Sequence, residues 1–229
     1  MGSRIEFQTA NGTGSGYLAG GPGDSGVIVI QEWWGVVPQI EATCDRFAAA
    51  GFTALAPDLY GGRTVPPDEP DEPDEAAKQM MSLEVDAAAR ELSGAVDELV
   101  QRTGRQSVGA VGYCMGGGLA LLLGSERPDA VAAVVPCYGV HPWAEGQPDY
   151  ASLTAAVQIH CAGLDDYFTP EAAEALATTL RERGREVELY VYEGANHAFA
   201  NEDRPEVHDA GAASLMFDRT VAFLTSHLV

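Results

Sequence analysis

Short apolar runs alternate with longer amphipathic stretches along most of this chain. The short runs are rich in β-branched side chains and bounded by Gly, Pro or Asp, which is typical of strands, and they lie at residues 26–31, 53–56, 107–111, 130–136, 156–162 and 187–192. The stretches between them carry apolar residues at helical spacing and predict helices at residues 38–50, 76–102, 116–125, 170–183 and 212–227. This alternation predicts an α/β fold of three layers, with a mostly parallel sheet covered by helices on both faces.

One acidic segment interrupts this pattern without dividing the chain. The 229 residues are 46% hydrophobic, show no repeat or linker, and are expected to form one domain over residues 1–229. Residues 61–75 are mainly Gly, Pro and acid, a composition that buries too little apolar surface and predicts an exposed, mobile loop. A charge run of this kind is usually solvated surface, so an interaction role is the weaker interpretation.

The charge balance excludes some classes of partner. Thirteen basic residues against 34 acidic ones give a formal charge of −21, which disfavours binding to nucleic acid or to an anionic membrane. No apolar stretch has the length of a signal peptide or a bilayer span, so the expected location is the cytoplasm. The four cysteines show no CxxC or zinc-type spacing and are expected to be reduced thiols. No metal or organic cofactor is expected.

The sequence VGAVGYCMGGG at residues 108–118 has the form of a nucleophile elbow in which cysteine replaces serine. Gly112 and Gly116 flank Cys114, as a tight strand-to-helix turn requires. At the start of a helix, the helix dipole and free N–H groups favour the thiolate form. By itself, the pattern also fits a buried structural cysteine or a phosphate-binding loop.

Candidate partners for the nucleophile follow the later strands in the order that this elbow requires, with an acid before a histidine. Asp165 and Asp166 come after the strand at 156–162, and His197 comes after the strand at 187–192. Glu32, at the end of the first predicted strand, is either functional or a carboxylate held by a nearby N–H.

The same elbow predicts two backbone donors and an aromatic pocket. The N–H groups of Trp33 and Met115 are the candidate oxyanion hole. Aromatic side chains near these motifs either line a substrate pocket or pack in the core, and the candidates are Trp34, Tyr113, Tyr138 and Phe199, with Trp33 and Trp143 beside them.

The motifs QEWWG, GYCMGG, GLDDYFTP and GANHAF occur in this order, and with them the whole chain resembles the dienelactone hydrolase family, the carboxymethylenebutenolidases. The resemblance implies an α/β-hydrolase fold and a triad of Cys114, His197 and Asp166. Asp166 is preferred to Asp165 because of the family spacing to Pro170. The resemblance also implies that Glu32 restrains the thiol at rest and takes its proton when substrate binds.

The resemblance implies a hydrolase that opens a small-molecule ester or enol-lactone through a cysteine thiolate. The expected oligomeric state is a monomer or weak homodimer. Family members bind the substrate carboxylate with arginines, but Asn201 stands where one of them is expected, and the sequence does not place Arg63 or Arg204. The alternatives are an esterase or lactonase for neutral substrates and a non-hydrolytic thiol redox or binding protein.

Overall fold

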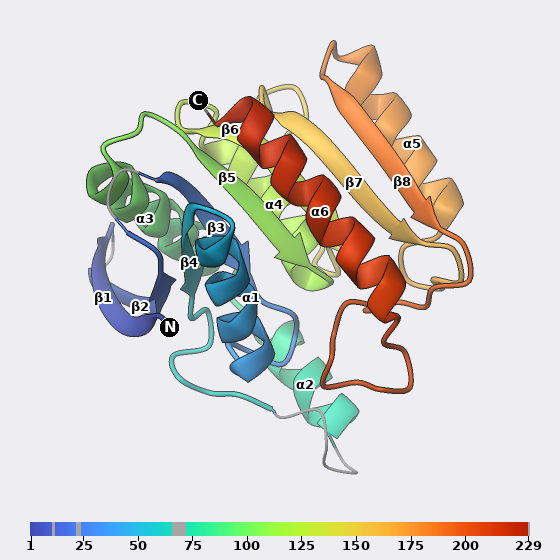
Figure 1. Ribbon diagram of the computed structural model, residues 1–229, viewed down its shortest axis with the longest axis horizontal. Coiled ribbons are helices and arrows are strands. Elements are labelled where there is room, and N and C mark those ends of the chain that lie inside the picture. Colours follow the sequence, from blue (N-terminus) through green and yellow to red (C-terminus); the bar gives the residue numbers. More distant parts are fainter. Residues whose placement is uncertain (11, 22–23, 66–71, 229) are drawn as a thin grey trace.

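A single eight-stranded sheet forms the middle of the molecule (Figure 1). The computed structural model describes residues 1–10, 12–21, 24–65 and 72–228. The strand order is β1-β2-β4-β3-β5-β6-β7-β8. In chain order the strands are β1 (Ser3–Thr9), β2 (Gly12–Ala19), β3 (Ser25–Ile30), β4 (Phe52–Pro57), β5 (Val108–Tyr113), β6 (Val131–Cys137), β7 (Ala156–Ala162) and β8 (Val187–Tyr192).

The strands predicted from apolar runs are all present, and from β4 to β8 every neighbouring pair in the sheet is parallel. The first two strands were not predicted. They form an antiparallel hairpin, and β2 continues the sheet beside β4. β1 is mostly exposed and β2 is rich in glycine, so neither strand carries the continuous apolar run by which the parallel strands are recognised.

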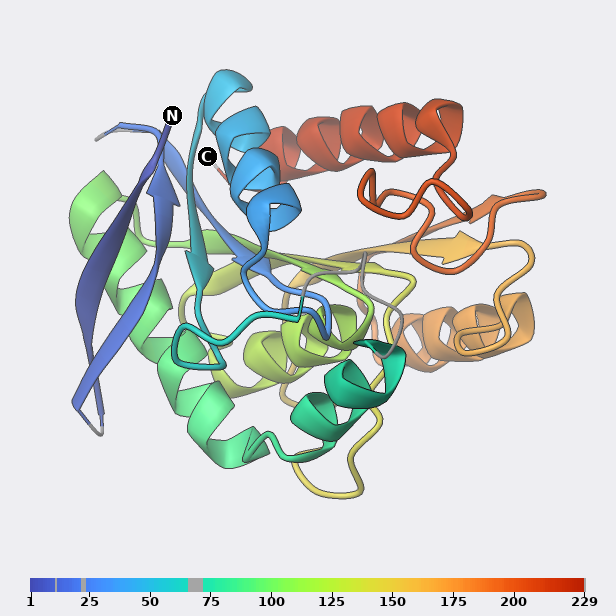
Figure 2. The same cartoon turned by 90° about the horizontal axis from the view of Figure 1, so that it is seen from below.

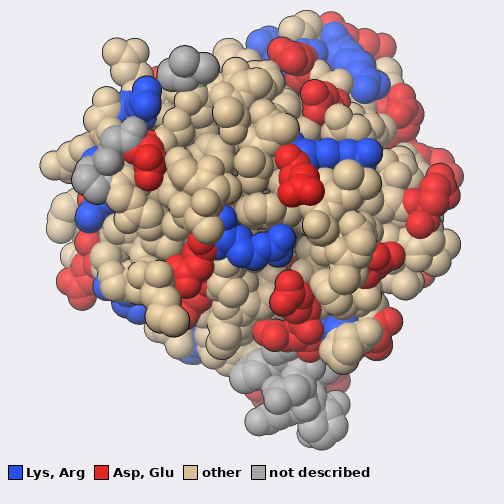
Figure 3. Space-filling model, viewed as in Figure 1, with Lys and Arg blue, Asp and Glu red and all other residues tan. Residues whose placement is uncertain are grey.

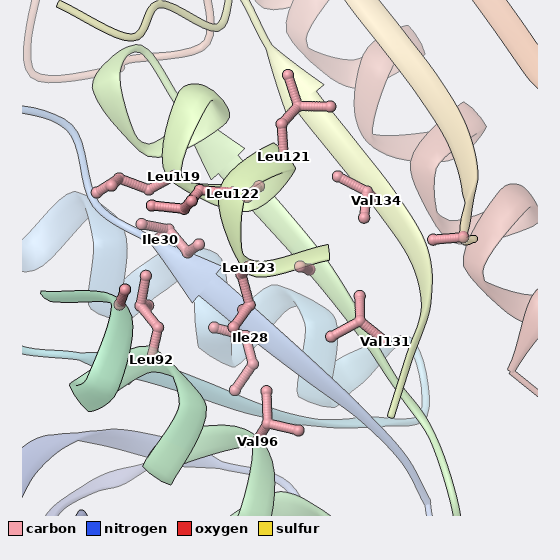
Figure 4. Close-up of a cluster of buried hydrophobic side chains, with 14 of the residues drawn as sticks. Ile28, Ile30, Leu92, Val96, Leu119, Leu121, Leu122, Leu123, Val131 and Val134 are labelled. Carbon is pink, nitrogen blue, oxygen red and sulfur yellow. The ribbon is translucent and has the colours of Figure 1, made fainter. Parts of the chain in front are cut away.

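Helices cover both faces of the sheet (Figure 2). One face carries α1 (Pro38–Ala49) and α6 (Ala210–His227), and the other carries α3 (Val85–Thr103), α4 (Met115–Glu126) and α5 (Pro170–Glu182). Each face has its own apolar cluster, and the α3 and α4 side is drawn in Figure 4. There Ile28 and Ile30 of β3 pack with Leu92 of α3 and Leu119 of α4. The three-layer α/β architecture expected from the sequence is confirmed.

The predicted helix at 76–102 is wrong in one respect, because the chain forms two helices there. The first, α2, spans Glu72–Met81, so the predicted loop also ends earlier than residue 75. Ala76 of α2 packs in the cluster of α1 and α6, whereas Met80 of α2 packs against the cluster of α3 and α4. The chain turns at residues 82–84, where Ser82 donates to the carbonyl of Gln79 and Glu84 is extended.

The expected loop is only partly described. Residues 66–71, which hold much of the acidic near-repeat, lie outside the described residues. Val65 is buried, and its N–H donates to the carbonyl of Trp34 at 2.9 Å. The start of the segment is therefore attached to the loop that follows β3.

Acidic side chains are scattered over the face shown in Figure 3, with fewer basic side chains between them. Within the described ranges, no helix is both long and apolar enough to span a lipid bilayer.

His160 of β7 is a fully buried polar residue whose ring is satisfied on both nitrogens. The hydroxyl of Tyr192 donates to Nδ1 at 2.9 Å, and Nε2 faces Gln158 at 2.9 Å and Thr220 at 3.1 Å. Burial, with a smaller effect from Arg219, lowers the pKa of His160 to about 3. The neutral imidazole with its proton on Nε2 is therefore part of the folded core.

This network predicts a pH-dependent loss of stability. The pKa of His160 in the folded protein lies below its ordinary value, so on acidification the unfolded chain binds the proton first. The contribution of the neutral His160 network to the free energy of unfolding is therefore complete above about pH 6.5 and declines toward pH 3. His160→Gln is expected to be less stable than wild type at pH 7, and the difference should narrow by up to about 1.4 kcal/mol for each pH unit below 6.5. Urea unfolding at pH 7, 6, 5 and 4 measures both curves. A difference that stays constant with pH would contradict this account.

Candidate active site

Cys114 occupies the sharp turn between β5 and α4, at the carboxyl ends of the parallel strands, which point toward the lower edge of Figure 1. Its backbone has φ 53° and ψ −121°, an unusual conformation for a residue with a Cβ atom. The N–H of Cys114 donates to the carbonyl of Cys137 at 3.1 Å, and its own carbonyl accepts from Val140 at 3.0 Å. β6 and the loop after it therefore hold the strained residue in place.

Glycines make this turn sterically possible. A Cβ atom on Gly112 would overlap the carbonyl oxygen of Gly116, and one on Gly116 would overlap the carbonyl of Ile30. The tight strand-to-helix turn predicted at residues 108–118 is thus present, with the thiol at the amino end of α4.

The carboxylate beside His197 is Asp165, and the expectation of Asp166 is wrong. Oδ2 of Asp165 accepts from Nδ1 of His197 at 2.7 Å, and its Oδ1 accepts from the N–H groups of Tyr167 at 2.8 Å and Phe168 at 3.0 Å. The Asp165 carboxylate is completely buried, whereas Asp166 is exposed at the rim of the pocket. The turn that directs Asp165 inward directs its neighbour outward, and a motif with two adjacent acids carries no signal for this.

His197 lies between Asp165 and Cys114. Burial by itself would lower the pKa of His197, but hydrogen bonds to Asp165 and Cys114 and the negative charge of both partners outweigh it and raise the pKa to about 10. Because Nδ1 is bonded to the carboxylate, Nε2 is the nitrogen left to exchange a proton with the thiol. The rings of Tyr138 and Tyr167 flank the imidazole, with centroids 5.3 Å and 5.1 Å away.

Glu32 is a buried carboxyl group beside these residues, and only 2% of it is exposed. Its Oε2 accepts from Nδ2 of Asn201 at 2.8 Å. Burial raises the pKa of Glu32, although Asn201, the positive charge of His197 and the nearby Tyr138 hydroxyl oppose the rise. Among the described residues, neither Oε1 of Glu32 nor the Tyr138 hydroxyl has a hydrogen-bond partner of normal geometry.

A pocket of about 870 Å³ opens over these groups. Cys114, His197, Glu32 and both Trp33 and Trp34 line it. Trp33 belongs to the loop after β3 and Met115 is the first residue of α4, so both predicted backbone donors adjoin residues of the pocket. Within the described part of the chain, no group of His, Cys, Asp and Glu side chains is arranged to hold a metal ion.

The predicted aromatic pocket is largely wrong, because only Trp34 of the four main candidates lines the cavity. Tyr113, Tyr138 and Phe199 are buried in the cluster on the α6 side. The Tyr138 ring lies 6.1 Å from Tyr113 and 5.4 Å from Phe199, so these three form a packed layer behind His197. Trp143 is also buried, and its indole N–H donates to the carbonyl of Met80 at 3.0 Å.

Two residues of the loop after β8 were not recognised as part of the site. Asn201 is completely buried and holds Glu32, and Arg204 lines the pocket. Arg63 is not among the described residues that line the pocket, and its Nε donates to the carbonyl of Tyr60. The sequence signalled Asn201 only as a departure from an expected arginine.

Comparison with known proteins shows the family to which the chain belongs. The model of the dienelactone hydrolase family matches residues 15–228. The chain belongs to the dienelactone hydrolase family. It is 33% identical to protein usf of Aquifex pyrophilus over the whole of both chains, and 28% identical to the carboxymethylenebutenolidase of Pseudomonas putida, covering 96% of this chain and 94% of the relative. A dienelactone hydrolase-like hydrolase is therefore established.

Solved structures show the same fold as this dienelactone hydrolase family member. A candidate dienelactone hydrolase from Klebsiella pneumoniae superposes with a TM-score of 0.86 at 23% identity, with 99% of each chain covered. A dienelactone hydrolase-like promiscuous phosphotriesterase from metagenomic libraries has a TM-score of 0.82 at 21% identity, covering 100% of this chain and 99% of its own. These likenesses extend over the complete sheet and confirm the α/β-hydrolase fold.

The neighbouring acids provide a matched test of the Asp165 and His197 contact. Asp165→Asn removes the charge that favours the imidazolium, and the pKa of His197 is expected to fall by roughly one to three pH units. Asp166→Asn should leave it unchanged within a few tenths of a unit, since that side chain faces solvent. NMR titration of the His197 ring protons distinguishes the two variants. A larger decrease in Asp166→Asn than in Asp165→Asn would contradict the pairing.

Proposed function

We propose that this hydrolase cleaves carboxylic esters and lactones through the thiolate of Cys114. The observation that carries the proposal is the chain of contacts from Asp165 to His197 to Cys114, with the cysteine at a strained turn facing the pocket. A nucleophile, a basic nitrogen and an orienting carboxylate in this order form the arrangement that acyl transfer requires.

In the proposed reaction, Glu32 takes the thiol proton, and the sulfur of Cys114 forms a bond to the carbonyl carbon. The N–H groups of Trp33 and Met115 hold the oxyanion that develops. The tetrahedral adduct collapses to a thioester as the carbon–oxygen bond breaks, and the imidazolium of His197 gives its proton to the leaving oxygen.

The second half of the reaction restores the enzyme. His197, oriented by Asp165, takes a proton from water while the hydroxide adds to the thioester carbonyl. The acid is released as the thiolate leaves, and Glu32 returns its proton to the sulfur. The raised pKa values of Glu32 and His197 support these roles, because both groups exchange protons with the thiol and the leaving group.

A thiolate nucleophile restricts the range of substrates. Thiolate is a better leaving group from the tetrahedral adduct than an amide nitrogen, so the adduct of a peptide reverts to reactants more often than it goes forward. Activated esters and lactones are therefore favoured over amides. The absence of an arginine at position 201 supports neutral substrates within this class.

Removal of the thiol tests the proposal directly. Cys114→Ala is expected to lose hydrolysis of p-nitrophenyl acetate by at least about 10³-fold, while Cys44→Ala, which changes a buried cysteine on α1, retains most of it. Release of p-nitrophenol gives both rates, and circular dichroism confirms that the variants fold. Equal rates in Cys114→Ala and wild type would refute the mechanism. Stoichiometric acylation of wild type without turnover would indicate a thiol-binding protein instead.

The contact between Asn201 and Glu32 predicts a shift in the pH profile. The Asn201 amide stabilises the Glu32 carboxylate, so Asn201→Leu should raise the pKa of Glu32 further. Because the proposed base is the ionised form, the acidic limb of kcat/KM should move to higher pH by roughly one unit while the rate on the plateau changes less. An unchanged acidic limb would exclude Glu32 as the group that receives the proton.

A further inference from the structure

The cavity extends well beyond the reacting atoms. Its volume of about 870 Å³ lies near the upper end of the roughly 300–1,000 Å³ typical of pockets for drug-sized ligands. A compact monocyclic lactone seated on Cys114 would leave most of this space unfilled. The shape and chemistry of the remaining space therefore contain information about the substrate.

The two ends of the cavity differ in character. One wall is apolar and lies on the α4 side of the sheet, where it is formed by Met80, Leu121, Val140, Tyr150, Phe168 and Leu176. The other wall comes from the loops after β7 and β8 and is called the polar wall, because it holds the polar side chains of Asp166, Asn196, Arg204 and Glu206 beside the less polar Leu164, Tyr167 and Val207. Figure 2 shows α2 and α4 on one side of the sheet and the segment between β8 and α6 on the other.

The position of His197 assigns the two ends to the two parts of an ester. His197 belongs to the loop after β8, on the side of the polar wall, and it must reach the leaving oxygen to protonate it. The leaving group therefore lies toward the polar wall. The acyl group, on the other side of the carbonyl carbon, extends along α4 over the apolar wall.

The charges around the pocket disfavour an anionic acyl group. Arg204 already binds Glu206, with its Nε and Nη2 both 2.8 Å from Oε1 of that residue. His141 borders the apolar wall, and its Nε2 lies 3.1 Å from the carbonyl oxygen of Glu145. Glu32 and Asp166 add negative potential near the thiol, so a substrate carboxylate would meet little uncompensated positive charge.

We propose that the physiological substrates are esters with an extended, uncharged acyl chain, which binds along the apolar wall between α4 and α5. This inference rests on the proposed thiol hydrolase, and it adds the class of acyl group. Leu121 on α4 and Leu176 on α5 are the specificity-determining residues, because they border the path that the chain takes away from Cys114.

A chain-length series on the wild-type enzyme is the first test. p-Nitrophenyl acetate, butyrate, hexanoate and octanoate share one leaving group. For each ester, kcat/KM is divided by the rate constant of its hydrolysis by hydroxide, and differences in this ratio report on contacts between the acyl chain and the apolar wall. Each buried CH₂ is expected to increase the ratio about two- to fourfold, giving roughly 16- to 250-fold over the four CH₂ groups from acetate to hexanoate. A flat or declining series would overturn the inference.

A matched pair of substrates tests the charge. The mono-p-nitrophenyl ester of adipate has a six-carbon acyl chain like the hexanoate, but it ends in a carboxylate. It is expected to react at least about tenfold more slowly in kcat/KM, since burying an uncompensated carboxylate is costly. An adipate ester that reacts as fast as the hexanoate would overturn the uncharged class and indicate anion binding at His141 or Arg204.

Blocking the wall with a larger side chain tests the residues. Leu176→Trp should lower the ratio of kcat/KM for the octanoate to kcat/KM for the acetate at least about tenfold, because only the long chain reaches α5. Leu215→Trp is the matched control, since Leu215 is exposed on α6, on the opposite face of the sheet. An equal decrease for both esters, or no decrease for the octanoate, would overturn the assignment.

These outcomes are separable from failure of the proposed function. If Cys114→Ala retains the wild-type rate on the acetate, the thiol mechanism is wrong whatever the chain-length series shows. If Cys114→Ala is inactive and the wild-type series is flat, the mechanism stands and only the acyl class is wrong. Acetate hydrolysis by Leu176→Trp also shows directly that this variant has folded.

Discussion

The close approach of β5, α4 and β3 around Cys114 is the constraint on which the site depends. A side chain at Gly112 or Gly116 would collide with backbone atoms, so the turn exists only with hydrogen at these positions. The turn fixes Cys114 in a strained conformation, and the hydrogen bonds to Cys137 and from Val140 hold it there. Because the same contacts bring α4 against β3, the thiol, Glu32 and the loop of Trp33 meet at one edge of the sheet.

The electrostatics of the site follow from burial as well as from charge. Glu32 and His197 lie close together. Desolvation favours the neutral form of Glu32, whereas Asp165 and Cys114 favour the protonated form of His197. Asn201 ties Glu32 to the loop that carries His197, so both acid–base groups depend on the same segment after β8. In the proposed mechanism, the groups that exchange protons with the thiol and the leaving group are therefore positioned by this loop.

Much of this arrangement could be predicted from the sequence, because its signals are local. Buried parallel strands require apolar runs, and the elbow requires glycine at fixed spacing, so β3 to β8 and Cys114 were recognisable. The choice between Asp165 and Asp166 was not, since it depends on which side of a turn faces His197. Tyr113, Tyr138 and Phe199 were misplaced for a related reason, because an aromatic residue beside a motif can point to the core or to the cavity with the same sequence pattern. The N-terminal hairpin was missed because glycine and exposed positions conceal its alternation.

Asn201, which stands where the family resemblance implies an arginine, bears on the class of substrate. The Asn201 amide binds Glu32 in the structure, so the proposed base is positioned by a side chain of the protein itself. Arg204 is neutralised by Glu206, and the space next to Cys114 along α4 is apolar. An anionic substrate would therefore gain little from the pocket, whereas a neutral acyl chain would gain from every methylene it buries. The contact between Asn201 and Glu32 therefore supports both proposals, namely a buried carboxyl group positioned as the base and a substrate with an uncharged acyl group.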